Sequence, residues 1–362
     1  MSRSPIDRLV VCVMAGGSGT RFWPVSRTAR PKQLLPLLDG ATLLGATIDR
    51  VAELCPPERT LVVTAERLAD ATRAALPGLP PEQVLAEPTP RNTAPCLGLA
   101  AIAAAQLAPD AILCLLPADH HVADGEAFRA ALATAAHAVA DGGIATLGVV
   151  PTHPETGYGY IEVGRDRGDG SSDVVRFVEK PDLPRAMDFL AGGRHLWNAG
   201  IFLGRADVLL AAVDATLPAL GEALRPLRND AAGPYHGPAF RDALAACFGA
   251  SPSISIDHGI MEHRDDLCVV PLQAGWSDVG SWRNVRDLGV DDEGNYRDGD
   301  TFALDCHDCV VVSDGPFVAA IGLQGVGVVA RGDAVLVLPL DRSQDVRAVV
   351  AELQARGRHD LL

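Results

Sequence analysis

Short runs of apolar residues recur along the chain and predict buried β-strands. These runs are rich in branched side chains and lie at residues 9–15, 61–65, 112–116, 144–150, 174–178 and 268–272. Longer alanine- and leucine-rich stretches with helical spacing lie between several of them, for example at 93–107 and 125–139. Strands that alternate with helices indicate an α/β fold with a parallel or mixed sheet and helices on both faces.

The pattern changes beyond about residue 290, where short β-prone pieces are separated by Gly, Asp and Asn. No helical spacing appears again until residues 342–353, which we expect to form a terminal helix. We therefore predict two domains, a larger one at residues 1–289 and a small β module at residues 290–362.

Composition and charge exclude several classes of protein. The chain has 362 residues and a formal net charge of -15, and an acidic surface repels DNA and RNA. No apolar run approaches the roughly 18 residues of a membrane span. The 8 cysteines are scattered, and Cys306 and Cys309 lack a second pair that would complete a zinc site. We expect a cytoplasmic protein with reduced, buried cysteines that binds neither nucleic acid nor a membrane.

A glycine-rich loop follows the first apolar run, in the stretch VVCVMAGGSGTRFWPVSRTARPKQ at residues 10–33. Gly16, Gly17 and Gly19 allow the backbone amides to approach a phosphate. The Walker P-loop needs a glycine where Arg21 stands, and the dinucleotide fingerprint needs one where Phe22 stands, so neither matches. Phosphate binding is favoured over a plain surface turn because four cations follow, namely Arg21, Arg27, Arg30 and Lys32.

Lysine is almost absent from the chain. Of 31 lysines and arginines, only Lys32 and Lys180 are lysines, and each is next to a proline, in RPKQ and FVEKP. A compact ammonium group and a planar guanidinium are not interchangeable where phosphate oxygens crowd together. Both lysines are therefore candidate phosphate ligands, with chance retention as the alternative.

Two aspartates are expected just after strands. Asp119 follows one apolar run, and Asp278 follows another and precedes a helix that Ser281 could cap. Open α/β sheets bind ligands at the carboxyl ends of their strands, and Mg²⁺ is held by few carboxylates plus substrate phosphates. We predict a Mg²⁺ site at Asp119 and Asp278, with a turn or helix-cap role as the alternative for each.

Seven motifs, in their order along the chain, carry a family resemblance that covers nearly the whole sequence. They are AGGSGTRFWPVSRTARPKQLLPL, EPTPRNTAP, LPADHHV, GYGYIEVG, FVEKPD, WNAGIFL and WSDVGSW. The chain resembles the sugar-nucleotide pyrophosphorylases, and closely the bacterial mannose-1-phosphate guanylyltransferases. This resemblance implies a Rossmann-like, GT-A-like nucleotidyltransferase fold, a C-terminal partial left-handed β-helix, and a homodimer.

The resemblance also implies roles for individual residues. Arg21 and Lys32 would neutralise the triphosphate, Lys180 would bind the sugar phosphate, and Asp119 and Asp278 would hold the metal. The loop that wraps the nucleotide phosphates would consist of Gly16, Gly17, Ser18, Gly19 and Thr20. The contacts to sugar hydroxyls would come from Glu162, Asn198 and the backbone at Gly159 and Gly200.

The segment EPTPRNTAP would face the base. Glu87 suits guanine because one carboxylate can accept hydrogen bonds from both N1–H and the 2-amino group, a pattern that adenine and uracil lack. The alternative is that Glu87 orients the loop, while the backbone at Asn92, Thr93 and Ala94 reads the base.

The implied reaction joins GTP and mannose 1-phosphate to give GDP-mannose and diphosphate. A sugar phosphate has a second pKa of about 6 and is already largely ionised, so it needs no protein base. Catalysis would consist of in-line positioning and of charge neutralisation by Mg²⁺, Arg21 and Lys32.

Some features leave alternatives open. Many relatives continue into a cupin-like isomerase domain, for which this chain lacks the length, so isomerase activity is not expected. Relatives typically have tyrosine and lysine where His258 and His263 stand, and Asp257 has either a sugar-orienting or a turn role. The alternative functions are a guanylyltransferase for another hexose or a heptose 1-phosphate, and a non-catalytic regulator that binds GDP-mannose.

Overall fold

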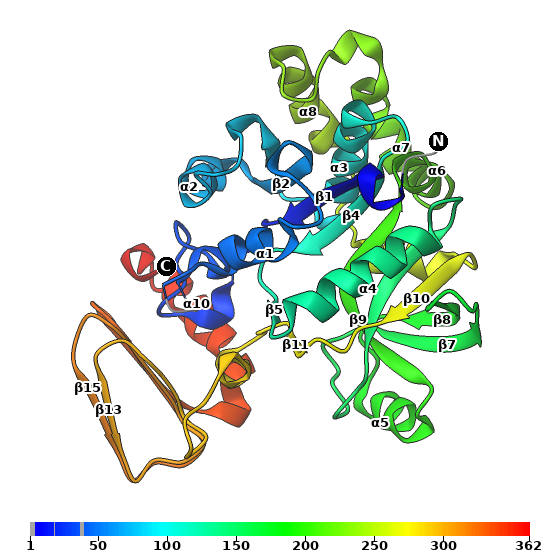
Figure 1. Ribbon diagram of the computed structural model, residues 1–362. Helices are drawn as coiled ribbons and strands as arrows, with labels where there is room; N and C mark the ends of the chain where they lie inside the picture. Colours follow the sequence, from blue (N-terminus) through cyan, green and yellow to red (C-terminus); the bar gives the residue numbers. More distant parts are fainter. Residues whose placement is uncertain (1–3, 18, 37–39) are drawn as a thin grey trace. The chain divides into compact units, whose positions relative to one another are not determined.

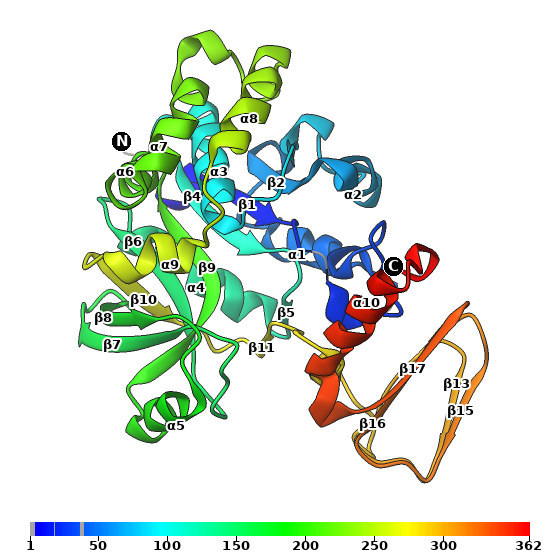
Figure 2. The ribbon, with the colours of Figure 1, turned by 180° about the vertical axis from the view of Figure 1, so that it is seen from behind.

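The computed structural model describes residues 4–17, 19–36 and 40–362, which form two compact units (Figures 1 and 2). Unit 1 consists of Met1–Gly16, Ile48–Pro117 and Asp124–Ala274. Unit 2 consists of Gly17–Thr47, Ala118–Ala123 and Gly275–Leu362. Ser18, expected in the phosphate loop, lies outside the described residues. The domain boundary expected after residue 289 stays a prediction.

Unit 1 is built on a nine-stranded mixed sheet with the order β3-β2-β1-β4-β9-β6-β10-β8-β7. Its strands are β1 (Leu9–Met14), β2 (Thr60–Ala65), β3 (Val84–Glu87), β4 (Ile112–Pro117), β6 (Ile144–Val149), β7 (Tyr160–Asp166), β8 (Ser172–Val178), β9 (His195–Arg205) and β10 (Leu267–Pro271). The first four are parallel, and β9 is antiparallel to both β4 and β6. All six predicted strands are present, and the predicted α/β class is confirmed.

Helices cover both faces of this sheet. α3 (Thr93–Leu107) packs against β1, β2 and β4, whereas α4 (Gly125–Ala138) packs against β6 and β10, and the two views show these helices on opposite faces (Figures 1 and 2). α3 is buried on all sides because it is apolar all round and lies between the sheet and the outer helices α6, α7 and α9. The other helices are α1 (Leu43–Val51), α2 (Ala69–Ala75), α5 (Leu183–Gly192), α6 (Ala206–Thr216), α7 (Pro218–Leu224), α8 (Pro238–Ala250) and α9 (Ile256–Gly259).

Unit 2 contains the predicted β module. β12 (Tyr296–Asp298), β14 (Val310–Asp314) and β16 (Val326–Arg331) are parallel, and β17 (Ala334–Pro339) is antiparallel to β16. β13 (Thr301–Leu304) and β15 (Val318–Ile321) form a second parallel pair, and β5 (His121–Val122) pairs with β11 (Trp276–Ser277). A chain that alternates between two parallel ladders coils like a β-helix.

A glycine permits one of the turns in this coil. Gly299 has φ +78°, and a Cβ there would lie 1.9 Å from the Ser313 carbonyl oxygen. No larger residue fits this turn.

The predicted start of the terminal helix and the predicted capping role of Ser281 are wrong. The terminal helix α10 is Val346–Ala355, and a 3₁₀ segment, Leu340–Asp345, precedes it. The Ser343 hydroxyl donates to the Leu340 carbonyl at 2.7 Å, which favours the tighter turn. Ser281 precedes a 3₁₀ helix, but its hydroxyl donates to Asn284 Oδ1 at 2.9 Å and caps no backbone amide.

The cysteines behave as predicted, since all eight are free thiols in buried positions. Cys306 and Cys309 pack with Val311 and Ala320 inside the β module. The Asn295 side chain joins the two cysteines, because its Nδ2 donates to the Cys306 carbonyl and its Oδ1 accepts from the Cys309 amide, at 2.8 and 2.9 Å. Within the described ranges, no helix has both the length and the apolar character needed to cross a bilayer.

Candidate active site

Lys32 is the centre of a charged cluster in unit 2. Its Nζ donates to Asp119 Oδ2 at 3.0 Å and to the backbone carbonyl of Asp278 at 2.7 Å, and it lies 5.4 Å from the centroid of the Phe22 ring. Only 5% of the lysine side chain is exposed, and a buried ammonium group needs such partners. The structure therefore brings together three residues that the sequence assigns to phosphate and metal binding.

Gly19 holds the glycine loop close to this lysine. It has φ +58°, and a Cβ at this position would lie 2.5 Å from the Lys32 Cβ and 2.7 Å from its backbone nitrogen. The Ser26 hydroxyl donates to the Gly19 carbonyl at 2.8 Å, and Gln33 Nε2 donates to the Gly17 carbonyl at 3.3 Å. Only glycine fits at position 19, because both the backbone conformation and the space forbid a side chain.

The first two glycines of the loop are open to solvent. Gly16 and Gly17 are exposed, and Thr20 begins a short 3₁₀ helix, Thr20–Phe22, that contains Arg21. The Arg21 guanidinium makes one long hydrogen bond, 3.5 Å from Nη1 to Gln344 Oε1. This part of the loop therefore offers accessible amides and a weakly held cation.

Asp119 remains ionised in this cluster. Burial by itself would raise the pKa of its carboxyl group, but the charges of Lys32, His120 and Arg21 and the hydrogen bond from Lys32 lower that pKa below its ordinary value. About 40% of the Asp119 side chain is exposed. An ionised and accessible carboxylate of this kind can bind a divalent cation.

The turn that carries Asp278 is strained. Val279 is fully buried and has φ +42°, a conformation that β-branched residues rarely adopt. Its amide donates to the Ser277 hydroxyl at 3.1 Å, and that hydroxyl donates to Asp287 at 2.6 Å. The Gly280 amide donates to Asp278 Oδ1 at 2.9 Å. These bonds hold the strained turn and so fix the position of the aspartate.

The cluster fits a metal ion that shares its ligands with a substrate. Asp119 and Asp278 supply hard oxygen donors, and Lys32 joins them. The described residues contain no group of three or more His, Cys, Asp or Glu side chains that could hold a metal ion. Mg²⁺ suits this arrangement, because it is commonly bound by one or two carboxylates together with phosphates and water.

The four cations after the loop do not share one role. Arg27 pairs with Asp333 at 2.6 Å, and Arg30 pairs with Asp314 at 3.6 Å, both in the β module. These two arginines anchor the segment on carboxylates of the chain itself. Arg27 and Arg30 therefore support phosphate binding by this segment less than Arg21 and Lys32 do.

Glu87, in unit 1, is a buried carboxylate without a partner. It ends β3, is 6% exposed, and its Oε1 is buried with no hydrogen-bond partner among the described residues. Burial raises the pKa of this group to about 7. A Cβ at Gly16 would lie 3.7 Å from Glu87 Oε2, so the glycine leaves the carboxylate uncrowded. An unsatisfied buried acceptor is costly unless a ligand supplies donors.

The segment after Glu87 is held by hydrogen bonds of its own. The Thr93 amide donates to Asn92 Oδ1 at 2.9 Å, and the Ala94 amide donates to the Ile254 carbonyl at 3.1 Å. Thr93 Oγ1 accepts from the Ile256 amide at 2.9 Å. The backbone amides of Thr93 and Ala94 are therefore already engaged. This favours base recognition by the Glu87 carboxylate over recognition by the backbone at residues 92–94.

Lys180, also in unit 1, lies in a second cluster. Its Nζ pairs with Glu179 Oε1 at 2.6 Å, and 59% of its side chain is exposed. Lys180 has φ +44°, and its amide donates to the Tyr158 carbonyl at 3.2 Å. The neighbouring Glu179 amide donates to Glu262 Oε1 at 3.0 Å. The turn is therefore fixed, while the ammonium group remains accessible.

Asn198 connects the predicted sugar contacts. Its Oδ1 accepts from the Gly200 amide at 3.0 Å, its Nδ2 donates to Asp257 Oδ1 at 2.9 Å, and its own amide donates to the Gly159 carbonyl at 2.8 Å. A Cβ at Gly159 would lie 2.7 Å from Glu179 Oε2, so a side chain there would displace the acid. These hydrogen bonds bring Gly159, Asn198 and Gly200 together.

Glu162 lies elsewhere in the sheet. Its carboxylate is within 3.5 Å of Arg176 and 3.8 Å of Arg194, and it makes no hydrogen bond with Asn198 or Lys180. The acid that does contact Lys180 is Glu179, which the sequence analysis does not single out. The sequence could have indicated this contact, because Glu179 directly precedes Lys180 in FVEKP.

Asp257 is the second acid of this cluster. Burial, together with the charge of Glu179, raises the pKa of its carboxyl group to about 6. His258, whose contacts the sequence leaves open, has Nδ1 3.0 Å from Glu262 Oε2, and Glu262 accepts the Glu179 amide. This histidine therefore supports the turn that carries the acid and the lysine.

The chain is similar to known proteins over nearly its whole length. Residues 10–294 match the nucleotidyl transferase family, and residues 299–353 match the mannose-phosphate isomerase/GMP-like β-helix domain. The xanthan biosynthesis protein XanB of Xanthomonas campestris pv. campestris is 41% identical over 350 residues, which cover 96% of this chain and 74% of that protein. The mannose-1-phosphate guanylyltransferase RfbM of Salmonella typhimurium is 38% identical, with 96% of this chain and 73% of that protein covered.

The chain is also similar to a solved structure. A protein of Thermus thermophilus, described as a mannose-1-phosphate geranyltransferase, is 39% identical, with a TM-score of 0.87 over 96% of this chain and 99% of that one. The family resemblance carried by the seven sequence motifs is thereby confirmed. The chain belongs to the nucleotidyl transferase family, and its C-terminal part matches the mannose-phosphate isomerase/GMP-like β-helix domain.

Proposed function

We propose that the protein is a mannose-1-phosphate guanylyltransferase, which converts GTP and α-D-mannose 1-phosphate into GDP-mannose and diphosphate. Relatives that bear this name are 37–38% identical over most of the chain. The observation that carries the proposal is the Lys32 cluster, in which one buried ammonium group joins Asp119 and Asp278 beside the glycine loop. Such a cluster suits a polyphosphate with a divalent cation.

Recognition of the base is assigned to Glu87. Its partnerless buried carboxylate would accept N1–H and the 2-amino group of guanine. Adenine and uracil lack this pair of donors, so GTP is the expected nucleotide.

Recognition of the sugar phosphate is assigned to the second cluster. The exposed ammonium group of Lys180 would bind the phosphate, and Glu179, Asn198 and the backbone at Gly159 and Gly200 would contact hydroxyl groups. A role for Glu162 in sugar binding stays a prediction, because its arginine partners occupy its carboxylate.

The chemistry needs charge neutralisation rather than proton transfer. The sugar phosphate, with a second pKa of about 6, is ionised at neutral pH and attacks the α-phosphorus without a protein base. Arg21 and Lys32 would offset the charge that builds up on the α-phosphate and on the departing diphosphate. Mg²⁺ held by Asp119 and Asp278 would supply further charge neutralisation when bound.

The proposal includes a homodimer in the cytoplasm. On β13 and β15, Leu304 stands beside Ile321 and Phe302 beside Ala319, and the three large side chains of this set are 46–63% exposed. Adjacent exposed apolar side chains of this kind favour contact with another copy.

The test is an assay of GTP consumption and diphosphate release, with and without mannose 1-phosphate and with and without Mg²⁺. Release that depends on both the sugar phosphate and the metal is expected. Release without sugar would overturn the transferase assignment, and absence of turnover with intact GDP-mannose binding would favour the regulator. Turnover with other hexose or heptose 1-phosphates, compared under the same conditions, separates the sister enzymes.

A further inference from the structure

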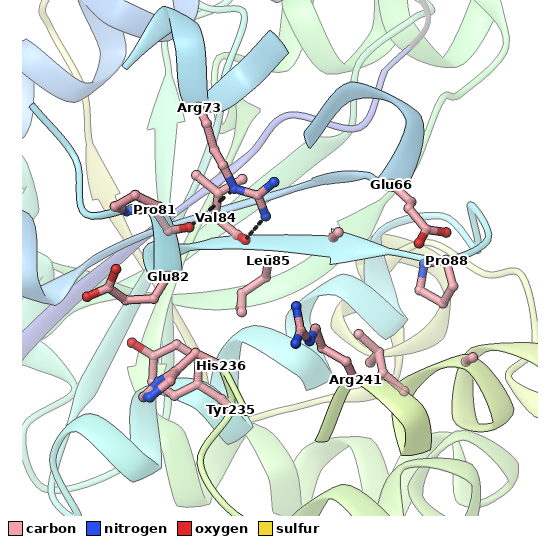
Figure 3. Close-up of a pocket in the computed structure, with 13 residues that line it drawn as sticks. Glu66, Arg73, Pro81, Glu82, Val84, Leu85, Pro88, Tyr235, His236 and Arg241 are labelled. Atoms are coloured by element: carbon pink, nitrogen blue, oxygen red, sulfur yellow. Dashed lines mark hydrogen bonds between the residues drawn. The ribbon is translucent and has the colours of Figure 1, made fainter. Parts of the chain in front are cut away.

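A pocket of about 540 Å³ lies along β3, the strand at one edge of the nine-stranded sheet (Figure 3). Its walls are Val84, Leu85 and Ala86 of this strand, side chains of the α2 region on one side, and α8 with the loop before it on the other. A pocket of this volume suits one small molecule. None of the residues assigned above to base, sugar, phosphate or metal lines it.

β3 lies at the edge of the sheet, but a side chain prevents another strand from pairing with it. Arg73 of α2 donates to the carbonyl groups of Pro81 and Val84 at 3.4 and 3.5 Å, as the dashed lines in Figure 3 show, and it pairs with Asp70 at 2.9 Å. Its guanidinium covers carbonyl groups that a pairing strand would need. An extended peptide is therefore disfavoured as the occupant, and a compact molecule is favoured.

The pocket contains one arginine without a partner. The Arg241 side chain extends from α8 toward β3 (Figure 3), and its guanidinium makes no hydrogen bond or ion pair with any described residue. A free guanidinium fork matches the oxygens of a phosphate group. The wall beside it is apolar and is formed by Leu85, Leu244 and Ala245, while the arginine itself is exposed.

A second group of residues offers an aromatic surface and a carboxylate. Tyr235 is buried and fixed, because its hydroxyl donates to Gln83 at 2.7 Å and its amide donates to Gln106 at 2.7 Å. The exposed His236 ring lies edge-on to it, with the centroids 5.1 Å apart. Burial and the nearby charge of Glu82 both raise the pKa of the Tyr235 phenol.

We propose that this pocket binds a guanine nucleotide, at a site separate from Glu87. The base would stack on His236 and donate N1–H and its 2-amino group to Glu82, while the phosphates would bind Arg241. The strand that walls the pocket ends at Glu87, so the two nucleotide sites share β3.

The test is equilibrium dialysis of labelled GDP against the full chain. Two GDP molecules per chain are expected for the natural protein, and one for Arg241→Ala. Ala245→Trp, at an exposed position on the same helix, should fill the pocket and also leave one. Arg225→Ala is the matched control, because this arginine is 69% exposed and lies outside the pocket, and it should keep both.

The outcomes separate this proposal from the proposed function. One GDP per chain in the natural protein that Arg241→Ala retains, or two in both pocket variants, would overturn the pocket site. Equal binding of ADP at the site that Arg241→Ala removes would overturn the assignment to guanine. Glu87→Ala should lose the other site and keep the pocket site. If it keeps both, the role of Glu87 in base recognition fails, while the pocket proposal stands.

Discussion

Lys32 and Lys180 are the only two lysines of the chain, and their surroundings are opposite. Lys32 is 5% exposed and bonded to a carboxylate and a carbonyl group beside an aromatic ring, whereas Lys180 is 59% exposed and has one carboxylate partner. The first charge is therefore held in place before any ligand binds. The second can still move to meet one.

The two regions share one feature, a backbone turn with a positive φ that hydrogen bonds to side chains hold in place. Val279, next to Asp278, and Lys180 itself have φ values of +42° and +44°. Side chains outside each turn, those of Ser277 and Glu262, bond the amides that fix it. The two lysines therefore differ in burial and in their partners, while both regions contain a fixed turn. Substitutions of the two lysines should have different effects.

The largest expected effect comes from Lys32→Arg. A guanidinium is wider than the ammonium that now fits between Asp119, the Asp278 carbonyl and Phe22, so the charge would be displaced from the reacting phosphates. We expect kcat to fall by about a hundredfold or more. Steady-state kinetics measures this, with circular dichroism as the check on folding. Near-normal kcat in a folded variant would contradict the role of the buried charge.

Lys180→Arg should act on the sugar phosphate without steric strain, because this side chain is mostly exposed. We expect kcat/KM for mannose 1-phosphate to fall by about a hundredfold, and the thermal stability to stay the same. The control is the KM for GTP, which should change little. A variant that loses GTP affinity and keeps sugar affinity would reverse the assignment of the two clusters.

Glu87 sharpens the comparison, since it is buried like Lys32 but has no partner. Its pKa is raised from 4.5 to about 7, so between these pH values the folded protein binds more protons than the unfolded chain. The free energy of unfolding must then fall as the pH rises through this window. Glu87→Gln removes this effect. The gain in free energy of unfolding of this variant over the natural ligand-free protein should therefore be larger at pH 8 than at pH 4, by up to about 3 kcal/mol.

Urea unfolding at several pH values measures the difference between this variant and the natural protein. Glu58→Gln, at an exposed position, is the matched control and should leave the pH profile unchanged. A stability difference for Glu87→Gln that is the same at pH 4 and pH 8 would show that the carboxylate is not buried without a partner.

The smallest effect is expected for Asp333→Asn. Asp333 is 57% exposed and pairs with Arg27, which anchors the loop segment rather than a ligand. Its loss should reduce the free energy of unfolding by less than about 1 kcal/mol and leave kcat unchanged. A large fall in kcat, measured beside Lys32→Arg, would show that Arg27 also serves the phosphates.

The strands of unit 1 were predictable because parallel strands covered on both faces read as continuous apolar runs. All six predicted runs form strands, and α3 has the predicted bounds, residues 93–107. Strands β3, β7 and β9 were not predicted, although each contains apolar or branched residues. The start of α10 was wrong because a serine side chain competes for a backbone carbonyl, a local contact that apolar spacing does not reveal.

The candidate site was predictable where residue type is unusual. The rarity of lysine pointed to Lys32, but its partners lie 87 and 246 residues away, so only the fold could show the contact. The same distance along the chain hid the anchoring role of Arg27, whose partner is 306 residues away. The positive φ of Val279 had no signal either, because valine disfavours that conformation and tertiary contacts impose it.

The segment 17–47 belongs to the same compact unit as residues 275–362, and Trp23 Nε1 donates to the carbonyl of Leu361, 338 residues further along the chain. Chains are synthesised from the amino terminus, and domains generally fold as units. The lysine-bearing loop therefore leaves the ribosome well before residues 275–361, with which it packs in this unit. The proposed phosphate site around Lys32 is therefore completed only after the distant residues of this unit have been made.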